Sequence, residues 1–91
     1  MILHIIGNAV NIERVGNTIS FLRKRAVFTQ KDVADHIGIS DKAVSTWERG
    51  WTLPDIICLT KLVILLDTDI DSLLAGDVAY YDQRWHGALS I

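Results

Sequence analysis

Hydrophobic residues recur along residues 12–25 at the three- and four-residue spacing of an amphipathic helix. Four of them fall on one face: Ile12, Val15, Ile19 and Leu22. The basic segment 23–25 follows, where positive charge is favourable beside the negative end of the helix dipole. The pattern predicts a first helix that ends near residue 25.

A short second helix is predicted over residues 29–37. Thr29 and Asp32 have the spacing of a capping box, in which the Thr hydroxyl accepts a backbone N–H of the first turn. Three residues supply its buried face: Val33, Ala34 and Ile37. Gly38 can end the helix, because glycine adopts the left-handed conformation without steric cost.

Only Ile39 separates Gly38 from Ser40, which is a suitable N-cap for a third helix that Gly50 can end. Its inward side is expected to hold Ala43, Val44 and Trp47. Positions 42, 45, 46 and 49 share the opposite, polar side, which can lie in a DNA major groove about 12 Å wide. The short turn between the two helices has the length found in DNA-binding helix-turn-helix motifs.

Two more helices follow, and no strand is predicted among the five. Pro54 fits the first turn of a fourth helix, which runs to about Leu66. Its core residues are expected to be Ile56, Leu59, Leu62, Val63 and Leu66. Asp69 can cap a short last helix that Gly76 ends. Residues 12–76 are therefore expected to form an all-α domain.

Both ends of the chain have an ambiguous pattern. Residues 2–6 and 78–81 have the composition of strands, and each is also compatible with a helix extension or a disordered end. The 91 residues contain no Pro/Ser-rich linker. They suit a single domain with a core at 12–76, a short N-terminal arm at 1–10 and a tail at 77–91.

Charge is unevenly distributed between two parts of the chain. The net charge is −2, which alone does not favour a nucleic-acid partner. Residues 13–51 nevertheless hold seven Lys and Arg against five Asp and Glu, whereas residues 52–91 hold two against six. This asymmetry is typical of a basic working face with an acidic remainder, although scattered surface charge also accounts for it.

A resemblance to a known family rests on a longer register of motifs. These are Leu22-Arg23-Lys24, Thr29-Gln30, Val33-Ala34, Ile37-Gly38-Ile39-Ser40, Val44-Ser45-Thr46-Trp47-Glu48-Arg49-Gly50, Pro54-Asp55 and Leu73-Leu74-Ala75-Gly76. Over about residues 12–76 the chain resembles the lambda repressor/Cro-like family, also called the xenobiotic-response-element type. The resemblance implies a five-helix DNA-binding domain that regulates transcription, with the third helix in the major groove and the second crossing above it.

The resemblance also implies roles for individual residues. The positions that contact base edges are Ser40, Asp41, Lys42, Ser45 and Thr46. Gln30 matches a contact to the phosphate backbone, and Arg23 and Glu48 match an internal salt bridge. Asp41 can accept a hydrogen bond from cytosine N4 or can simply stabilise the N-terminus of its helix, and both readings stay open.

Four further cations are candidate contacts to the DNA backbone on their charge alone: Arg14, Arg25, Lys31 and Arg49. Trp47 is expected in the core. Trp51 stands where the family usually has a polar or basic residue. It can pack under its loop or rest against the sugar edge of DNA, and the sequence does not choose.

The fourth helix is apolar on a second side, where Ile57 and Ile64 share a face with Thr60. We expect this face to form a two-fold dimer interface or to be covered by the aromatic residues of the tail: Tyr80, Tyr81 and Trp85. A homodimer reads two half-sites about 34 Å apart. The expected target is thus an inverted repeat in double-stranded DNA, bound by a repressor.

The alternative function is an antitoxin or protein-binding adaptor that uses the same fold, with a toxin or regulator bound through the tail. An enzyme is not expected, because His4, His36 and His86 lie far apart and show no metal-ligand or nucleophile–base spacing. No metal, cofactor or small-molecule effector is expected. The single Cys58 and the lack of a signal peptide or a membrane-length apolar run indicate a cytoplasmic protein.

Overall fold

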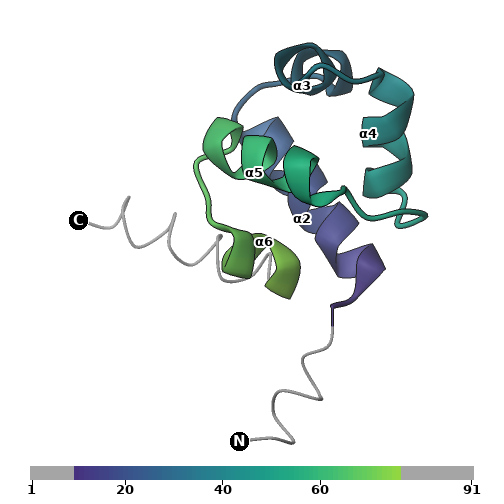
Figure 1. Ribbon diagram of the computed structural model, residues 1–91, viewed down its shortest axis with the longest axis vertical. Coiled ribbons are helices and arrows are strands. Elements are labelled where there is room, and N and C mark those ends of the chain that lie inside the picture. The colour runs from purple at the N-terminus through teal and green to yellow at the C-terminus, as the bar shows by residue number, and fades with distance from the viewer. Residues whose placement is uncertain (1–9, 77–91) are drawn as a thin grey trace, which may run out of the picture.

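The computed structural model describes residues 10–76, which form five helices and no strand (Figure 1). In chain order they are α2 (Ile12–Arg25), α3 (Gln30–Ile37), α4 (Asp41–Glu48), α5 (Ile56–Leu65) and α6 (Ile70–Ala75). The prediction of an all-α, five-helix fold is confirmed for this part of the chain. The alternatives weighed for residues 2–6 and 78–81 lie outside the described residues.

Each helix begins at a polar side chain that accepts a backbone N–H of the first turn. These N-caps are Asn11, Thr29, Ser40, Asp55 and Asp69. The predicted capping box of α3 is complete: the Asp32 N–H donates to the Thr29 hydroxyl at 3.0 Å, and the Thr29 N–H donates to the Asp32 carboxylate at 2.8 Å. These local bonds fix the helix starts, because they satisfy N–H groups that have no partner within the helix.

The placement of Pro54 in the first turn of the fourth helix was wrong. α5 begins at Ile56, two residues after Pro54, with Asp55 as its N-cap and Pro54 buried ahead of it. The Asp55 carboxylate accepts the Cys58 N–H at 2.8 Å. Proline has no side-chain oxygen with which to cap a helix, so the stronger cap determines the start.

One hydrophobic core receives side chains from all five helices. Its buried members are Val15, Ile19, Leu22, Val33, Ala34, Ile37, Val44, Trp47, Cys58, Leu59, Leu62, Leu66 and Leu73. The assignment of Ile56 to this core was wrong, because its side chain is 64% exposed. Ile56 lies one turn before Thr60 and two turns before Ile64, so it belongs to the outward side of α5, while Cys58 takes an inward position.

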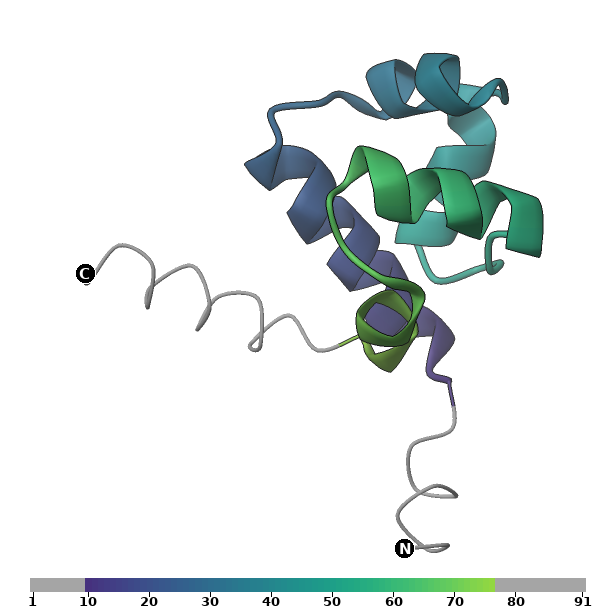
Figure 2. The same ribbon diagram turned by 60° about the vertical axis from the view of Figure 1, so that its left-hand side comes forward.

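α4 packs against both α2 and α3, whereas α5 packs against α3 and α6, and α6 also packs against α2. Figures 1 and 2 show α3 and α4 meeting at one corner of the molecule, with α6 toward the opposite end. α4 therefore lies at an edge of the fold, supported from behind by α2.

Gly16 of α2 lies where that helix crosses α4. A Cβ atom at this position would overlap the backbone oxygen of Trp47 and lie 3.1 Å from that of Glu48. Only a residue without a side chain lets the two backbones approach this closely. Gly16 thus sets the distance between α4 and its supporting helix.

We expect Gly16→Ala to lower the free energy of unfolding by about 1–3 kcal/mol, because the added methyl group forces the helices apart. In an open helix the same change stabilises by about 0.5–1 kcal/mol. Urea denaturation followed by circular dichroism measures the difference, with Asn17→Ala on the exposed side of the same helix as control. A Gly16→Ala variant as stable as the wild type contradicts the close packing of α2 and α4.

Candidate nucleic-acid interface

The turn between α3 and α4 is held by hydrogen bonds at both ends. Gly38 has a φ of +80°, and the N–H groups of Gly38 and Ile39 donate to the Ala34 carbonyl at 2.8 and 3.0 Å. Ser40 then accepts the Ala43 N–H at 3.3 Å. The predicted left-handed cap at Gly38 and the N-cap at Ser40 are both confirmed, and together they fix the direction in which α4 leaves α3.

α4 has a buried side and an exposed polar side. Val44 and Trp47 are 0% and 5% exposed and anchor the helix in the core. The proposed base-reading residues lie on the surface or at its edge: Ser40, Asp41 and Lys42 are exposed, and Ser45 and Thr46 are half-buried. The structure thus brings these five residues together between the N-cap Ser40 and Thr46 of one short helix.

The hydroxyl of Thr46 is already engaged within the protein. It donates to the Ala43 carbonyl at 2.7 Å and lies 3.0 Å from the hydroxyl of Thr52. Because its hydrogen is used, Thr46 can offer a base an acceptor lone pair or its methyl group, which suits the methyl of thymine. Lys42 and Ser45 can donate, and so can Ser40, because its hydroxyl only accepts from the Ala43 N–H within the protein.

A hydrogen-bond network joins α2, α3 and α4 beneath this face. Arg23 donates from Nε and Nη2 to the two carboxylate oxygens of Glu48 at 2.6 and 2.9 Å, and from Nη1 to the Phe28 carbonyl at 2.9 Å. Gln30 Nε2 donates to Glu48 Oε1 at 3.0 Å. The pair that the family resemblance implied is thus in contact, and Gln30, expected only at the DNA backbone, is part of the same network.

The network keeps Glu48 ionised although the carboxylate is largely buried. Burial alone raises the pKa of Glu48. The hydrogen bonds from Arg23 and Gln30 and the positive charge of Arg23 together lower it by more, so the pKa lies below its ordinary value. The hydrogen bond to Glu48 also raises the pKa of Arg23. A buried pair with matched hydrogen bonds fixes the geometry of α4 relative to α2.

The other candidate cations are dispersed over the described surface. Lys31 is exposed on α3 and forms a solvent-facing ion pair with Asp35 at 3.4 Å. Arg25 ends α2 with its guanidinium carbon 5.7 Å from the Phe21 ring. Arg14 is exposed on the first turn of α2, beside Gly76, the C-cap of α6. Of the four, Arg49 alone lies on α4's polar side, at the C-cap.

Trp51 does not pack under its loop. Its side chain is 65% exposed, and the Arg49 guanidinium carbon lies 5.0 Å from the centre of its ring. The sequence left this position open because the outcome depends on how the loop folds against α4. Trp47, in contrast, is a core residue as predicted.

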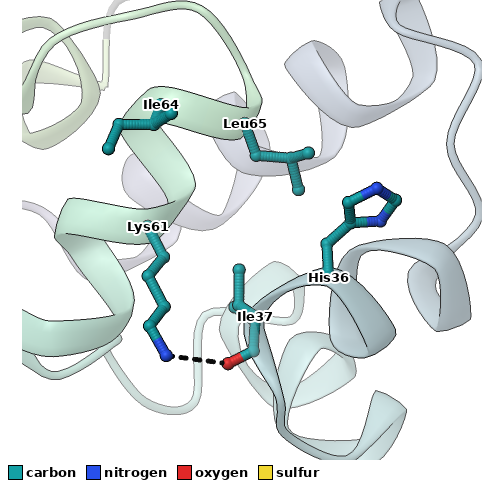
Figure 3. Close-up of a pocket in the computed structure, with 5 residues that line it drawn as sticks. All are labelled: His36, Ile37, Lys61, Ile64 and Leu65. Carbon is teal, nitrogen blue, oxygen red and sulfur yellow. Dashed lines mark hydrogen bonds between the residues drawn. The ribbon is translucent and has the colours of Figure 1, made fainter.

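A second exposed surface, here called the outer face of α5, runs along the side opposite the core. It consists of Ile56, Ile57, Thr60, Lys61 and Ile64, with Ile64 81% exposed. Ile64 and Lys61 also line a pocket of about 320 Å³ between α5 and the end of α3 (Figure 3). There the Lys61 ammonium group donates to the Ile37 carbonyl at 3.3 Å.

Residues 10–76, the part of the chain that the structure describes, lack the features of a metal site or a membrane span. No group of three His, Cys, Asp or Glu side chains there could hold a metal ion. In the same residues no helix has the length and apolar character needed to cross a membrane. Cys58 is buried, which raises the pKa of its thiol, and His36 is exposed.

The fold and the α3–turn–α4 unit define a helix-turn-helix protein. A family model described as Helix-turn-helix matches residues 19–73, and the chain belongs to this lambda repressor/Cro-like family. The sequence-based identification of the family is thereby confirmed.

Two relatives illustrate the likeness. The chain is 31% identical over 77 residues to Repressor protein C2 of Salmonella phage P22, covering 85% of this chain and 36% of that protein. It is 33% identical over 63 residues to the transcriptional regulator ImmR of Bacillus subtilis, covering 69% and 50%. The chain thus spans half or less of the length of these two relatives.

Solved structures agree with this assignment. The DNA-binding domain of the P22 C2 repressor superposes with a TM-score of 0.67 and 34% identity, covering 75% of this chain and 90% of that one. The biofilm regulator SinR, solved in complex with DNA, gives a TM-score of 0.62 and 28% identity, covering 66% and 97%. These likenesses extend over most of the described helices.

We expect Glu48→Gln to lower the free energy of unfolding at pH 7 by about 2 kcal/mol, because Arg23 loses its charged acceptor. The pKa of Glu48 is lowered by folding, so its contribution is present above the ordinary pKa of 4.5 and is lost as the pH falls through the folded value. The gap between wild type and variant should therefore close below about pH 4.5.

Urea denaturation at a series of pH values measures this gap. Asp35→Asn is the matched control, since its ion pair with Lys31 is exposed on both sides and contributes about 0.5 kcal/mol or less. A Glu48→Gln variant that differs from the wild type no more than Asp35→Asn does would falsify the scaffold role of the pair.

Proposed function

We propose that this chain is a sequence-specific DNA-binding transcriptional regulator that acts as a repressor and binds an inverted repeat as a homodimer. The observation that carries the proposal is the exposed polar side of α4, held in place by the Arg23–Glu48 network. The names of the relatives, a repressor and a regulator, support regulation over an antitoxin or adaptor role. In this proposal residues 12–76 are the DNA-binding core and 77–91 a tail.

Base reading is assigned to the N-cap Ser40 and to the exposed polar side of α4. Lys42 can donate to guanine O6 and N7, and Ser45 can donate or accept. Asp41 lies in the first turn of α4, where its charge also suits the positive helix end. In the major groove the same carboxylate can accept from cytosine N4. Ser40 and Thr46 complete the set at its two edges.

Contacts to the phosphate backbone are assigned to the start of α3 and to the candidate cations. Gln30 is the first residue of α3, where backbone N–H groups and the helix dipole favour an anion. Its amide nitrogen donates one hydrogen to Glu48 and carries a second that can donate to a phosphate. Lys31 follows Gln30 on α3, and Arg49, Arg25 and Arg14 are assigned contacts farther along the described surface.

Selection of bound duplexes from a random pool tests base reading. We expect the wild type to enrich an inverted repeat and Lys42→Ala to lose the preference at specific positions, with a loss of about 1–3 kcal/mol in discrimination there. Lys24→Ala removes another exposed lysine, on α2, and should leave the consensus unchanged. If the wild type enriches no sequence, or Lys42→Ala enriches the same one, base reading by α4 is wrong.

A homodimer is assigned to the outer face of α5. Three isoleucine side chains exposed along one helix face would be hydrated in a monomer, and a two-fold axis lets the same face bury itself against a second copy. One short helix reads few base pairs, whereas two copies read two half-sites. The dimer would thus supply the specificity that one α4 lacks.

The cytoplasm is the compartment assigned to such a regulator, because its single thiol, Cys58, is buried and unpaired with another cysteine.

Sedimentation of the double variant Ile57→Glu/Ile64→Glu tests the dimer. We expect the mass to fall from about twice to about once the chain mass of 10.2 kDa, because two carboxylates cannot be buried against their copies. Val27→Glu, at a residue that is 86% exposed between α2 and α3, should leave the mass unchanged. An unchanged mass contradicts the dimer. If unfolding is also easier in that case, the face is covered by the chain's own tail.

A further inference from the structure

A large aromatic side chain, that of Trp51, stands exposed directly after α4. Its exposed fraction of 65% contrasts with 5% for Trp47, four residues earlier. Exposed tryptophan is unfavourable in water, since its ring is one of the largest apolar surfaces a residue can present. No contact within the described residues buries the ring, so the ring is accessible to a partner.

The loop that carries Trp51 is firmly held. The Gly50 N–H donates to the Trp47 carbonyl and the Trp51 N–H to the Thr46 carbonyl, each at 3.0 Å. Gly50 has a φ of +74°, so these two bonds complete a Schellman motif. The exposure of the indole is therefore a property of the folded loop and not of a frayed helix end.

The indole lies next to the polar side of α4. Arg49 shares that side with Lys42, two turns earlier, and its guanidinium carbon is 5.0 Å from the Trp51 ring centre. On the other side of the loop, the hydroxyls of Thr52 and Thr46 are 3.0 Å apart. The loop thus extends the polar side of α4 beyond the end of the helix, and the ring restricts where the Arg49 charge can lie.

We propose that Arg49 and Trp51 together clamp one strand of the DNA beside the bases that α4 reads. The guanidinium binds a phosphate, and the indole orients it and covers the adjoining deoxyribose. This inference rests on the proposed function. It adds to it a strand contact that depends on an aromatic side chain and carries no base preference.

Charge favours a DNA strand over a second copy of the chain as the occupant. Two copies that met through this side would bring Arg49 and Lys42 of one close to the same cations of the other, which is unfavourable. A DNA strand supplies a phosphate for the guanidinium and an apolar sugar face for the ring. An arginine held by stacking also loses less side-chain freedom when it binds.

Fluorescence anisotropy of labelled DNA tests the clamp, with a duplex enriched by the wild type and a scrambled duplex. We expect Trp51→Ala to weaken binding to both duplexes roughly fivefold to thirtyfold, and Trp51→Phe to restore most of the loss. Arg49→Ala should lower the slope of log affinity against log salt by about 0.9, the value for one phosphate. Val27→Ala, which trims another exposed apolar side chain, should bind as the wild type does.

Quenching of tryptophan fluorescence by iodide gives a second readout. The part of the signal lost in Trp51→Phe should be quenched in the free protein and shielded when DNA is added. If Trp51→Ala binds both duplexes as the wild type does, the clamp is wrong while the proposed function stands. If the wild type enriches no duplex, the proposed function itself fails. A third outcome is that Trp51 of the wild type is shielded from iodide without DNA because the chain self-associates, while Trp51→Ala is a monomer. That outcome overturns the clamp in favour of a subunit interface.

Discussion

The bond between Arg23 and Glu48 is the interaction on which the arrangement of the DNA-reading helix depends. α4 has only eight residues, too few to be stable alone in water. Its direction is therefore set by its neighbours. Arg23 of α2 and Gln30 of α3 donate hydrogen bonds to the Glu48 carboxylate, and the backbones of α2 and α4 approach closely at Gly16. These contacts thus join α2, α3 and α4 into one unit.

Rigidity of this kind has a functional consequence. The inner side of α4 is anchored by Val44 and Trp47, so its outer side presents Lys42 and Ser45 in a fixed pattern. A fixed pattern loses little freedom on binding and can therefore discriminate among base edges. The same support extends through the Schellman motif to Trp51, so that one scaffold carries both the base-reading face and the proposed strand contact.

The features that sequence predicted well are local ones. Thr29, Gly38 and Ser40 act within a few residues of their own backbone, and each adopts the expected role. Ile56 was wrongly assigned to the core. Apolar residues occur on more than one side of α5, so their spacing allows more than one choice of inward side, and only packing against the other helices selects one. The close contact at Gly16 and the orientation of Trp51 depend on segments distant in sequence, so no local pattern reveals them. The Arg23–Glu48 pair was accessible only through the family resemblance.

The central claim is that the polar side of α4 and its following loop meet DNA. Titration of the isotope-labelled chain with a duplex selected from a random pool, followed by NMR, tests it most directly. The largest changes in amide resonances are expected at residues 40–46 and 49–52 and at the start of α3. Changes confined to the outer face of α5, or none at saturating DNA, would contradict it.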